Sequence, residues 1–261
     1  MNILSPNEIS QTDSAESEGR LFVSTEKTDV PLSRCYGRIP HLPGSQMTSD
    51  DRKAEDWQVH ICCEKLRDTK DHVVVQEKLD GSCMAVMKKN GEIIPMARSG
   101  NRAAVSRYKQ HRFFHKWVYE NLERFDGLLN ENEICMGEWL MQAHGTRYDL
   151  PHEPFVLFDL KSNGKFLTSA ALRKRATLFH FVTPQIIHEG TPIAVSRVVK
   201  LLKSSGHGAL DPVEGAVWRI ERNGQIDFRA KYVRPEKQIG SFLPQRPGQI
   251  SVWNWQPSKV F

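Results

Sequence analysis

The chain has 261 residues, enough to bury a full hydrophobic core as one large domain or two small ones. Its 39% hydrophobic and 26% charged residues are ordinary for a soluble globular protein, and neither a membrane-spanning apolar run nor a secretory segment after Met1 is visible. The formal net charge of +5 suits a polyanionic ligand without identifying one, and a cytoplasmic protein is the default expectation.

The first predicted elements in chain order are a tail and a loop. Residues 1–30 are rich in Ser, Glu, Thr and Asp and poor in apolar residues, which predicts a mobile N-terminal tail. Residues 38–45 contain two prolines and a glycine, which predicts an ordered loop rather than a helix.

Three Asn-Gly pairs adjoin apolar runs and predict tight hairpin turns. They are Asn90-Gly91, Asn163-Gly164 and Asn223-Gly224. Both residues of such a pair tolerate positive φ, and the resulting turn matches the twist of the flanking strands. Three signals of this kind predict a body rich in antiparallel sheet.

Apolar residues at helical spacing predict three helices among the strands. The first covers about residues 106–124, the second runs from Thr168 or Ser169 to about Phe181, and the third covers residues 193–204. Tightly turned strands with separate helices indicate the α+β class, built on antiparallel sheets.

The cysteines give no sign of a zinc site or a disulfide framework. They are Cys35, Cys62, Cys63, Cys83 and Cys135. Their number is odd, and none has the Cys-x-x-Cys spacing of a metal site. We therefore expect reduced thiols that serve packing.

One lysine stands in a pattern that indicates chemistry. Lys78 opens a Lys-x-Asp-Gly tetrapeptide with Asp80 and Gly81, which alone is equally typical of a surface lysine before a β-turn. Five further segments follow it in order. They are Arg98-Ser99-Gly100, Gly137-Glu138-Trp139, Phe155-Val156-Leu157-Phe158-Asp159, Glu214-Gly215-Ala216-Val217 and Arg229-Ala230-Lys231.

This ordered set resembles the covalent nucleotidyltransferases, which comprise DNA ligases, RNA ligases and capping enzymes. Within them the resemblance is closest to ATP-dependent RNA ligases of the nick-sealing type. His144, Tyr148 and Leu150-Pro151, together with the loop at residues 40–45, look like elements of the same group.

The resemblance implies an antiparallel-sheet, ATP-grasp-like adenylyltransferase domain over residues 31–245, followed by a C-terminal tail at residues 246–261. DNA ligases and capping enzymes carry a further small barrel after the last lysine of the set. Only thirty residues follow Lys231, and a barrel needs more, so we expect no C-terminal OB barrel.

The resemblance also implies a role for Lys78. It would attack the α-phosphorus of ATP and carry AMP as a phosphoramidate, with Asp80 helping to assemble the site. A lysine is a nucleophile only when its pKa is lowered, and a bound divalent metal together with Lys231 could supply the necessary positive field. We expect Glu214 to bind this metal, Mg²⁺ or Mn²⁺.

The nucleotide would be held by a set of residues that the resemblance carries over. The expected set is Glu77, Lys78, Arg98, Glu138, Phe158, Val217, Arg229 and Lys231. In the family, the arginine matching Arg98 holds the sugar and the incoming strand, and the glutamate matching Glu138 contacts a ribose hydroxyl. The base would lie between Phe158 and Val217.

Arg229 and Lys231 alternate on one predicted strand, so both point to the same face, where they would neutralise the triphosphate. The family usually has lysine at both positions, and Arg229 departs from this pattern. We assign no chemistry to His41 or His144, because a single histidine is more often structural.

The expected function is ATP- and Mg²⁺-dependent joining of 5′-phosphate and 3′-hydroxyl RNA ends by a monomer with no membrane partner. Lysyl-AMP and an adenylylated 5′ end would be its intermediates. The enzymatic alternatives are a minimal DNA ligase and, third, a capping guanylyltransferase. The non-enzymatic alternative is a catalytically silent nucleic-acid-binding module of the same fold, recognisable by salt-dependent RNA binding without a covalent adduct.

Overall fold

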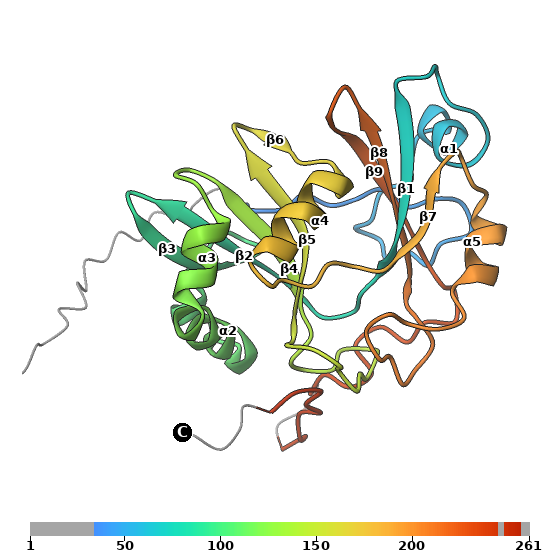
Figure 1. Cartoon of the computed structure of the whole chain (residues 1–261). Helices are drawn as coiled ribbons and strands as arrows, with labels where there is room; N and C mark the ends of the chain where they lie inside the picture. Colours follow the sequence, from blue (N-terminus) through green and yellow to red (C-terminus); the bar gives the residue numbers. More distant parts are fainter. Residues whose placement is uncertain (1–33, 245–247, 257–261) are drawn as a thin grey trace, which may run out of the picture. The chain divides into compact units, whose positions relative to one another are not determined.

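The computed structural model describes residues 34–244 and 248–256, so the tail predicted over residues 1–30 lies outside the described residues. Two antiparallel sheets with helices beside them make up this part of the chain (Figure 1). The predicted mixture of helices and antiparallel sheets is therefore confirmed. No helix of residues 34–244 and 248–256 is both long and apolar enough to cross a membrane.

The five-stranded sheet is built from consecutive strands, whereas the first strand of the four-stranded sheet is far in sequence from the other three. The four-stranded sheet has the order β7-β1-β8-β9, with strands β1 (Asp71–Lys78), β7 (Ile186–Gly190), β8 (Gly215–Arg222) and β9 (Gln225–Val233). The five-stranded sheet has the order β3-β2-β4-β5-β6, with strands β2 (Ser82–Lys89), β3 (Glu92–Ala97), β4 (Ile134–Trp139), β5 (Phe155–Ser162) and β6 (Lys165–Phe166). Since β1 and β2 lie in different sheets, the segment between Lys78 and Ser82 passes from one to the other.

The three predicted hairpins are confirmed. Asn-Gly turns join β2 to β3, β5 to β6 and β8 to β9, and all six turn residues have positive φ. This is the backbone that a two-residue turn between twisted strands requires. The hairpins therefore follow from local sequence alone.

The helices are α1 (Asp56–Cys63), α2 (Lys109–Glu120), α3 (Leu122–Leu128), α4 (Ser169–Leu178) and α5 (Val195–Leu201), with a short 3₁₀ helix at Ala103–Val105. Helices α2, α4 and α5 lie within the predicted helices but are shorter than predicted, and α1 was not predicted. The helix predicted over residues 106–124 is broken at Asn121, whose side chain donates to Trp117 O. Thr168 caps α4 by accepting a hydrogen bond from the Ala171 amide, and α4 stops before His180, which has a φ of 58°.

Helices cover one face of each sheet (Figure 1). In the five-stranded sheet, α2, α3 and α4 pack on a core that includes Phe114, Phe125 and Trp139. In the four-stranded sheet, α1 and α5 pack on a core that includes Trp218. Residues of the C-terminal segment join the first of these cores, where Trp253 and Trp255 pack against it.

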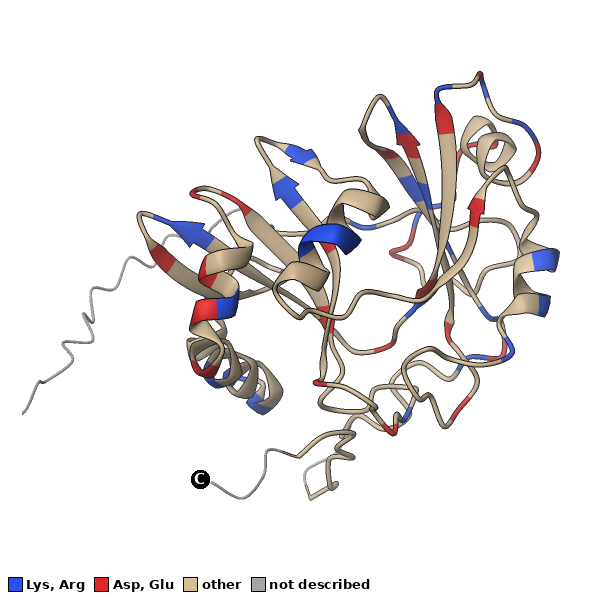
Figure 2. Cartoon of the chain, in the orientation of Figure 1, with Lys and Arg blue, Asp and Glu red and all other residues tan. Residues whose placement is uncertain are grey.

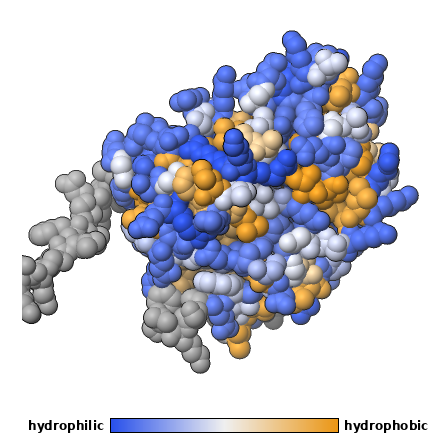
Figure 3. All heavy atoms as spheres, viewed as in Figure 1, coloured by the Kyte–Doolittle hydropathy of each residue, from blue (hydrophilic) through white to orange (hydrophobic). Residues whose placement is uncertain are grey.

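The loop predicted at residues 38–45 is present and runs along β9. The Leu42 amide donates to Lys231 O, and the Lys231 amide donates to Pro40 O, at 2.8 and 2.9 Å. All five cysteines are free, as predicted. Hydrophilic residues cover most of the face seen in Figure 3, with small apolar patches between them.

Candidate active site

A cavity of about 500 Å³ lies between the two sheets, within the size range of ligand pockets. Its walls come from strands of both sheets and from the segment that joins β1 to β2. The predicted site residues that line it are Glu77, Lys78, Asp80, Arg98, Glu138, Phe158, Glu214, Val217 and Lys231. Arg229 is not among the described residues that line it.

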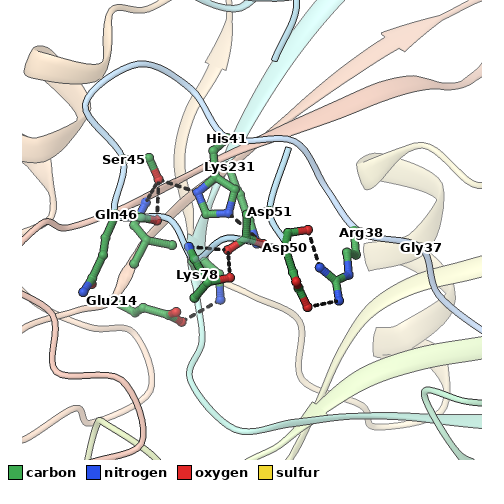
Figure 4. A network of polar contacts seen from close by, with 12 residues as sticks. Gly37, Arg38, His41, Ser45, Gln46, Asp50, Asp51, Lys78, Glu214 and Lys231 are labelled. Atoms are coloured by element: carbon green, nitrogen blue, oxygen red, sulfur yellow. Dashed lines mark hydrogen bonds and ion pairs between the residues drawn. The ribbon is translucent and has the colours of Figure 1, made fainter. Parts of the chain in front are cut away.

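Lys78 ends β1 with its ammonium group inside the cavity. Its Nζ donates to Glu214 Oε2 at 2.6 Å, and the two side chains face each other in Figure 4. Although burial opposes it, the negative charges of Glu214 and Glu138 raise the pKa of Lys78. The carboxylates set the direction of this shift, and the lowering of the Lys78 pKa by a bound divalent metal together with Lys231 stays a prediction.

Two carboxyl groups approach Lys78 from different strands. Glu138 on β4 accepts a 2.9 Å hydrogen bond from the Gly81 amide, and Glu214 directly precedes β8. Burial raises the pKa of both groups, that of Glu138 to about 8. Carboxylates that are costly to bury beside each other are stabilised by a cation, and here Lys78 supplies one.

A divalent cation would find suitable oxygen ligands at this point. No group of three or more His, Cys, Asp or Glu side chains arranged for a metal occurs among the described residues. Mg²⁺ is commonly held by one or two carboxylates and completes its shell with water and phosphate oxygens. Glu214, with its carboxylate in the cavity, fits that mode of binding.

Asp80 organises the segment between the sheets rather than facing the cavity as a free charge. Its Oδ2 accepts from the Gly145 amide at 2.9 Å and from Thr146 Oγ1 at 3.2 Å, and it pairs with Lys237 Nζ at 3.0 Å. Its amide donates to the hydroxyl of Tyr148. Asp80 therefore ties the segment that follows Lys78 to residues 145–148 and to Lys237.

Lys231 enters the cavity from β9 and is held by groups outside the predicted set. Its Nζ lies 3.7 Å from Asp51 Oδ1, which in turn lies 3.3 Å from His41 Nε2 (Figure 4). Although burial opposes it, hydrogen bonds from Thr48 and the charge of Lys231 hold the pKa of Asp51 well below its usual range. On its other side, the buried His41 ring contacts Ser45 Oγ at 2.7 Å through Nδ1.

The expected base-binding residues lie on the two sheets. Phe158 on β5 is half-buried, with its ring centroid 5.1 Å from that of Tyr36, and Val217 is on β8. Arg98 follows β3, and its guanidinium donates to the carbonyls of Tyr36 and Gly37. An aromatic ring, an aliphatic side chain and a cation are thus available in one cavity.

The guanidinium group of Arg229 pairs with a carboxylate that does not line the cavity. It donates to Asp159 Oδ1 at 2.8 Å, and its guanidinium carbon lies 4.1 Å from the Phe166 ring centroid. Arg219, which sequence reasoning did not single out, lines the cavity instead but also binds Asp159, at 2.7 Å. The tyrosine hydroxyl of Tyr36 donates to the same carboxylate at 2.6 Å.

Glu77 lines the cavity but has its carboxylate engaged elsewhere. Oε1 accepts from Ser205 Oγ and Oε2 accepts from the Gly206 amide at 2.9 Å. His144 likewise has structural partners, since its Nε2 lies 3.1 Å from Gln110 Nε2 and 3.4 Å from Ser82 Oγ.

Sequence reasoning missed the residues that position the predicted ones. They are Tyr36, Asp51, Thr146, Lys237 and Arg219. Each of these residues contacts a partner far away in the sequence, and no local sequence pattern predicts such a contact. Asp159 had a weak signal, because it ends the Phe155–Asp159 segment of the ordered set.

The chain belongs to the RNA ligase family, whose model matches residues 71–233, more than half of the chain. No curated protein matches it.

Among solved structures, similarity is found to a Naegleria gruberi RNA ligase with pyrophosphate, at 16% identity and a TM-score of 0.48 over 74% of this chain and 58% of that one. An archaeal ATP-dependent RNA ligase has 17% identity and a TM-score of 0.46 over 76% and 48% of the two chains. A putative ATP-dependent DNA ligase from Aquifex aeolicus has 16% identity and a TM-score of 0.40 over 62% and 43%. The chain therefore spans about half the length of these proteins, and family membership rests on the family model.

Proposed function

We propose that the protein is an ATP-dependent RNA ligase that joins a 5′-phosphate to a 3′-hydroxyl through a lysyl-AMP intermediate. The observation that supports this most directly is the position of Lys78 Nζ, in a cavity of nucleotide size with Glu214, Glu138 and Lys231 around it. Membership of the RNA ligase family favours RNA as the substrate. We further propose that residues 31–245 form the adenylyltransferase domain and that the protein acts as a monomer.

In the first step Nζ of Lys78 attacks the α-phosphorus of ATP. The Lys78 ammonium group must first give up one proton so that Nζ has a free lone pair, and Glu214 Oε2, 2.6 Å from Nζ, is the acceptor best placed for that proton. The nitrogen–phosphorus bond then forms, the bond to the pyrophosphate oxygen breaks, and Nζ releases a second proton to solvent. Lys231 neutralises charge on the phosphate oxygens, as cationic groups do in phosphoryl transfer.

A divalent cation held by Glu214 would supply further charge neutralisation at the phosphate oxygens, and Glu138 would contact a ribose hydroxyl. Phe158 and Val217 would hold the adenine, and Arg98 the sugar. In the later steps AMP passes from Lys78 to the 5′-phosphate of an RNA end. The 3′-hydroxyl of the second end then displaces AMP to form the phosphodiester.

The test is the intact mass of the protein after incubation with ATP and Mg²⁺. We expect a gain of one AMP in the wild type and none in Lys78→Ala, with the exposed Lys70→Ala as matched control. Absence of the gain in a wild type first freed of bound AMP with pyrophosphate would contradict the proposal. It would leave the silent nucleic-acid-binding module as the better explanation.

The choice of substrate distinguishes an RNA ligase from a minimal DNA ligase. Matched nicked duplexes that differ only in RNA or DNA at the nick should be sealed when the ends are RNA. Sealing of the DNA nick alone would replace RNA by DNA as the substrate. Labelling by GTP but not ATP would instead indicate a capping-type enzyme.

A further inference from the structure

A long stretch of the chain beside the cavity carries positive charge only. Residues 93–119 contain six Lys and Arg residues and no Asp or Glu. The stretch begins in β3, includes the cavity residue Arg98, and ends in α2. Figure 2 shows Lys and Arg along α2.

Three cations of this stretch are exposed and pair with no carboxylate of residues 34–244 and 248–256. Arg107 donates to the hydroxyl of Tyr108, and Arg112 donates to Ser106 O at 2.7 Å. Lys109 Nζ lies 5.3 Å from the centroid of the Phe113 ring. We call Arg107, Tyr108, Lys109 and Arg112 the α2 basic surface.

An aromatic ring connects the α2 basic surface with the cavity. Tyr108 is 49% exposed, and its ring centroid lies 5.1 Å from that of His111 and 4.8 Å from the guanidinium carbon of Arg107. His111 itself lines the cavity that contains Lys78. A strand that enters the cavity beside His111 would therefore meet an exposed aromatic face and then three cations.

A second, smaller cavity extends the same surface. It has a volume of about 220 Å³ and is lined by Lys109, Phe113, Met141, Trp253, Trp255 and Gln256. Lys109 is shared, since its Nζ also lies 5.9 Å from the Trp253 ring centroid. Cations close to accessible aromatic rings suit single-stranded nucleic acid, because phosphates need charge and unpaired bases need stacking partners.

We infer that the α2 basic surface binds the unpaired nucleotides of the RNA end whose terminus lies in the Lys78 cavity, an inference that rests on the proposed function. Arg107, Lys109 and Arg112 contact consecutive phosphates, and Tyr108 stacks on a base. The surface thereby supplies a grip on the RNA within the nucleotide-binding part of the chain.

The test compares two triple variants, each of which removes three positive charges from a different surface. Arg107→Ala/Lys109→Ala/Arg112→Ala changes the α2 basic surface, and Arg197→Ala/Lys200→Ala/Lys203→Ala changes exposed cations on and just after α5. Binding of a dye-labelled, 5′-phosphorylated single-stranded RNA is measured by fluorescence anisotropy without ATP, at several salt concentrations.

We expect the α2 triple variant to bind at least tenfold more weakly and to lose about 2 from the salt slope, since each single-strand phosphate contact contributes about 0.7. Tyr108→Ala should bind about tenfold more weakly with an unchanged slope, because stacking is uncharged. The α5 variant should bind like the wild type. Equal affinities and slopes for the two triple variants would overturn the inference.

Self-adenylation of the same proteins separates this inference from the proposed function. If all variants take up AMP and the α2 triple variant binds RNA normally, the RNA surface is wrong and the ligase proposal stands. If no protein takes up AMP but the α2 triple variant alone loses RNA affinity, the proposed function is wrong and the RNA surface stands.

Discussion

Lys231 is oriented in the cavity by the Asp51 carboxylate, which also lies beside a buried histidine. His41, 3% exposed, lies beside Asp51, and Asp51 lies beside Lys231. Thr48 fixes the carboxylate of Asp51 with two hydrogen bonds, of 3.0 and 2.9 Å. A flexible lysine side chain is thereby given one direction, and a phosphate group in the cavity meets a cation that is already oriented.

We predict that Asp51→Asn slows transfer of AMP to Lys78 by ten- to about a hundredfold, because a slightly misplaced catalytic cation costs that much. Lys231→Ala should cause a similar or larger loss, and the double variant should be no worse than Lys231→Ala. Asp50→Asn is the matched control, since Asp50 is exposed and pairs with Arg38. Single-turnover rates at saturating ATP measure the effect. Equal losses in Asp50→Asn and Asp51→Asn would show that the 48–51 turn acts only on stability.

At the scale of elements, the turn at residues 205–207 holds the end of β1 by hydrogen bonds. Ser205 and Gly206 bind Glu77, which directly precedes Lys78. His207 is 2% exposed, accepts from the Gln185 amide at Nε2, and contacts His152 Nε2 through Nδ1 at 2.8 Å. These partners require neutral His207 with its proton on Nδ1.

Burial and the neighbouring His152 lower the pKa of His207 to about 4. An unfolded histidine titrates near 6.5, so between pH 6.5 and 4 the unfolded state binds the extra proton. Stability is therefore lost as the pH falls through this window, by about 2 kcal/mol between pH 6.5 and 5 for this group. We predict that His207→Gln removes this part of the pH dependence, as measured by urea unfolding at both pH values. The same slope in wild type and variant would contradict the prediction.

The elements that sequence predicts well are those whose cause is local. Asn90-Gly91 specifies its hairpin through its own φ preferences, and Thr168 specifies the start of α4 through its own hydroxyl. β7 was not predicted, because a five-residue strand is defined by its pairing with β1, over a hundred residues away. α1 is only eight residues long and was also missed.

The candidate site divides in the same way. The ordered sequence segments predicted most of the site residues that line the cavity, because each segment can be recognised from a few consecutive residues. The partners of those residues could not be predicted: Glu214 pairs with Lys78, and Arg229 pairs with Asp159 outside the cavity. Each of these contacts joins residues that are far apart in the sequence.

At the scale of the whole described structure, one buried carboxylate joins the sheets. Asp159 on β5 is fully buried and accepts from Arg219 on β8, Arg229 on β9 and the hydroxyl of Tyr36. Although burial opposes it, the charges of the two arginines lower the pKa of Asp159. Arg219 also donates to Phe158 O, so the arginine that binds Asp159 also holds the backbone of Phe158, the expected base-stacking residue.

We predict that Asp159→Asn lowers the free energy of unfolding by about 3–5 kcal/mol, because the change leaves two buried guanidinium groups without a counter-charge. Asp126→Asn, which removes the partner of Lys88 at an exposed position, should cost less than about 1 kcal/mol. Urea unfolding at pH 7 measures both. ATP binding gives a second readout: Asp159→Asn should bind ATP more weakly even in the native baseline, since Phe158 and the two sheets lose their common anchor, whereas Asp126→Asn should bind normally. A cost of Asp159→Asn no larger than that of the surface control would show that the arginines are satisfied without Asp159, and that hydrophobic packing rather than this ion pair holds the cavity walls together.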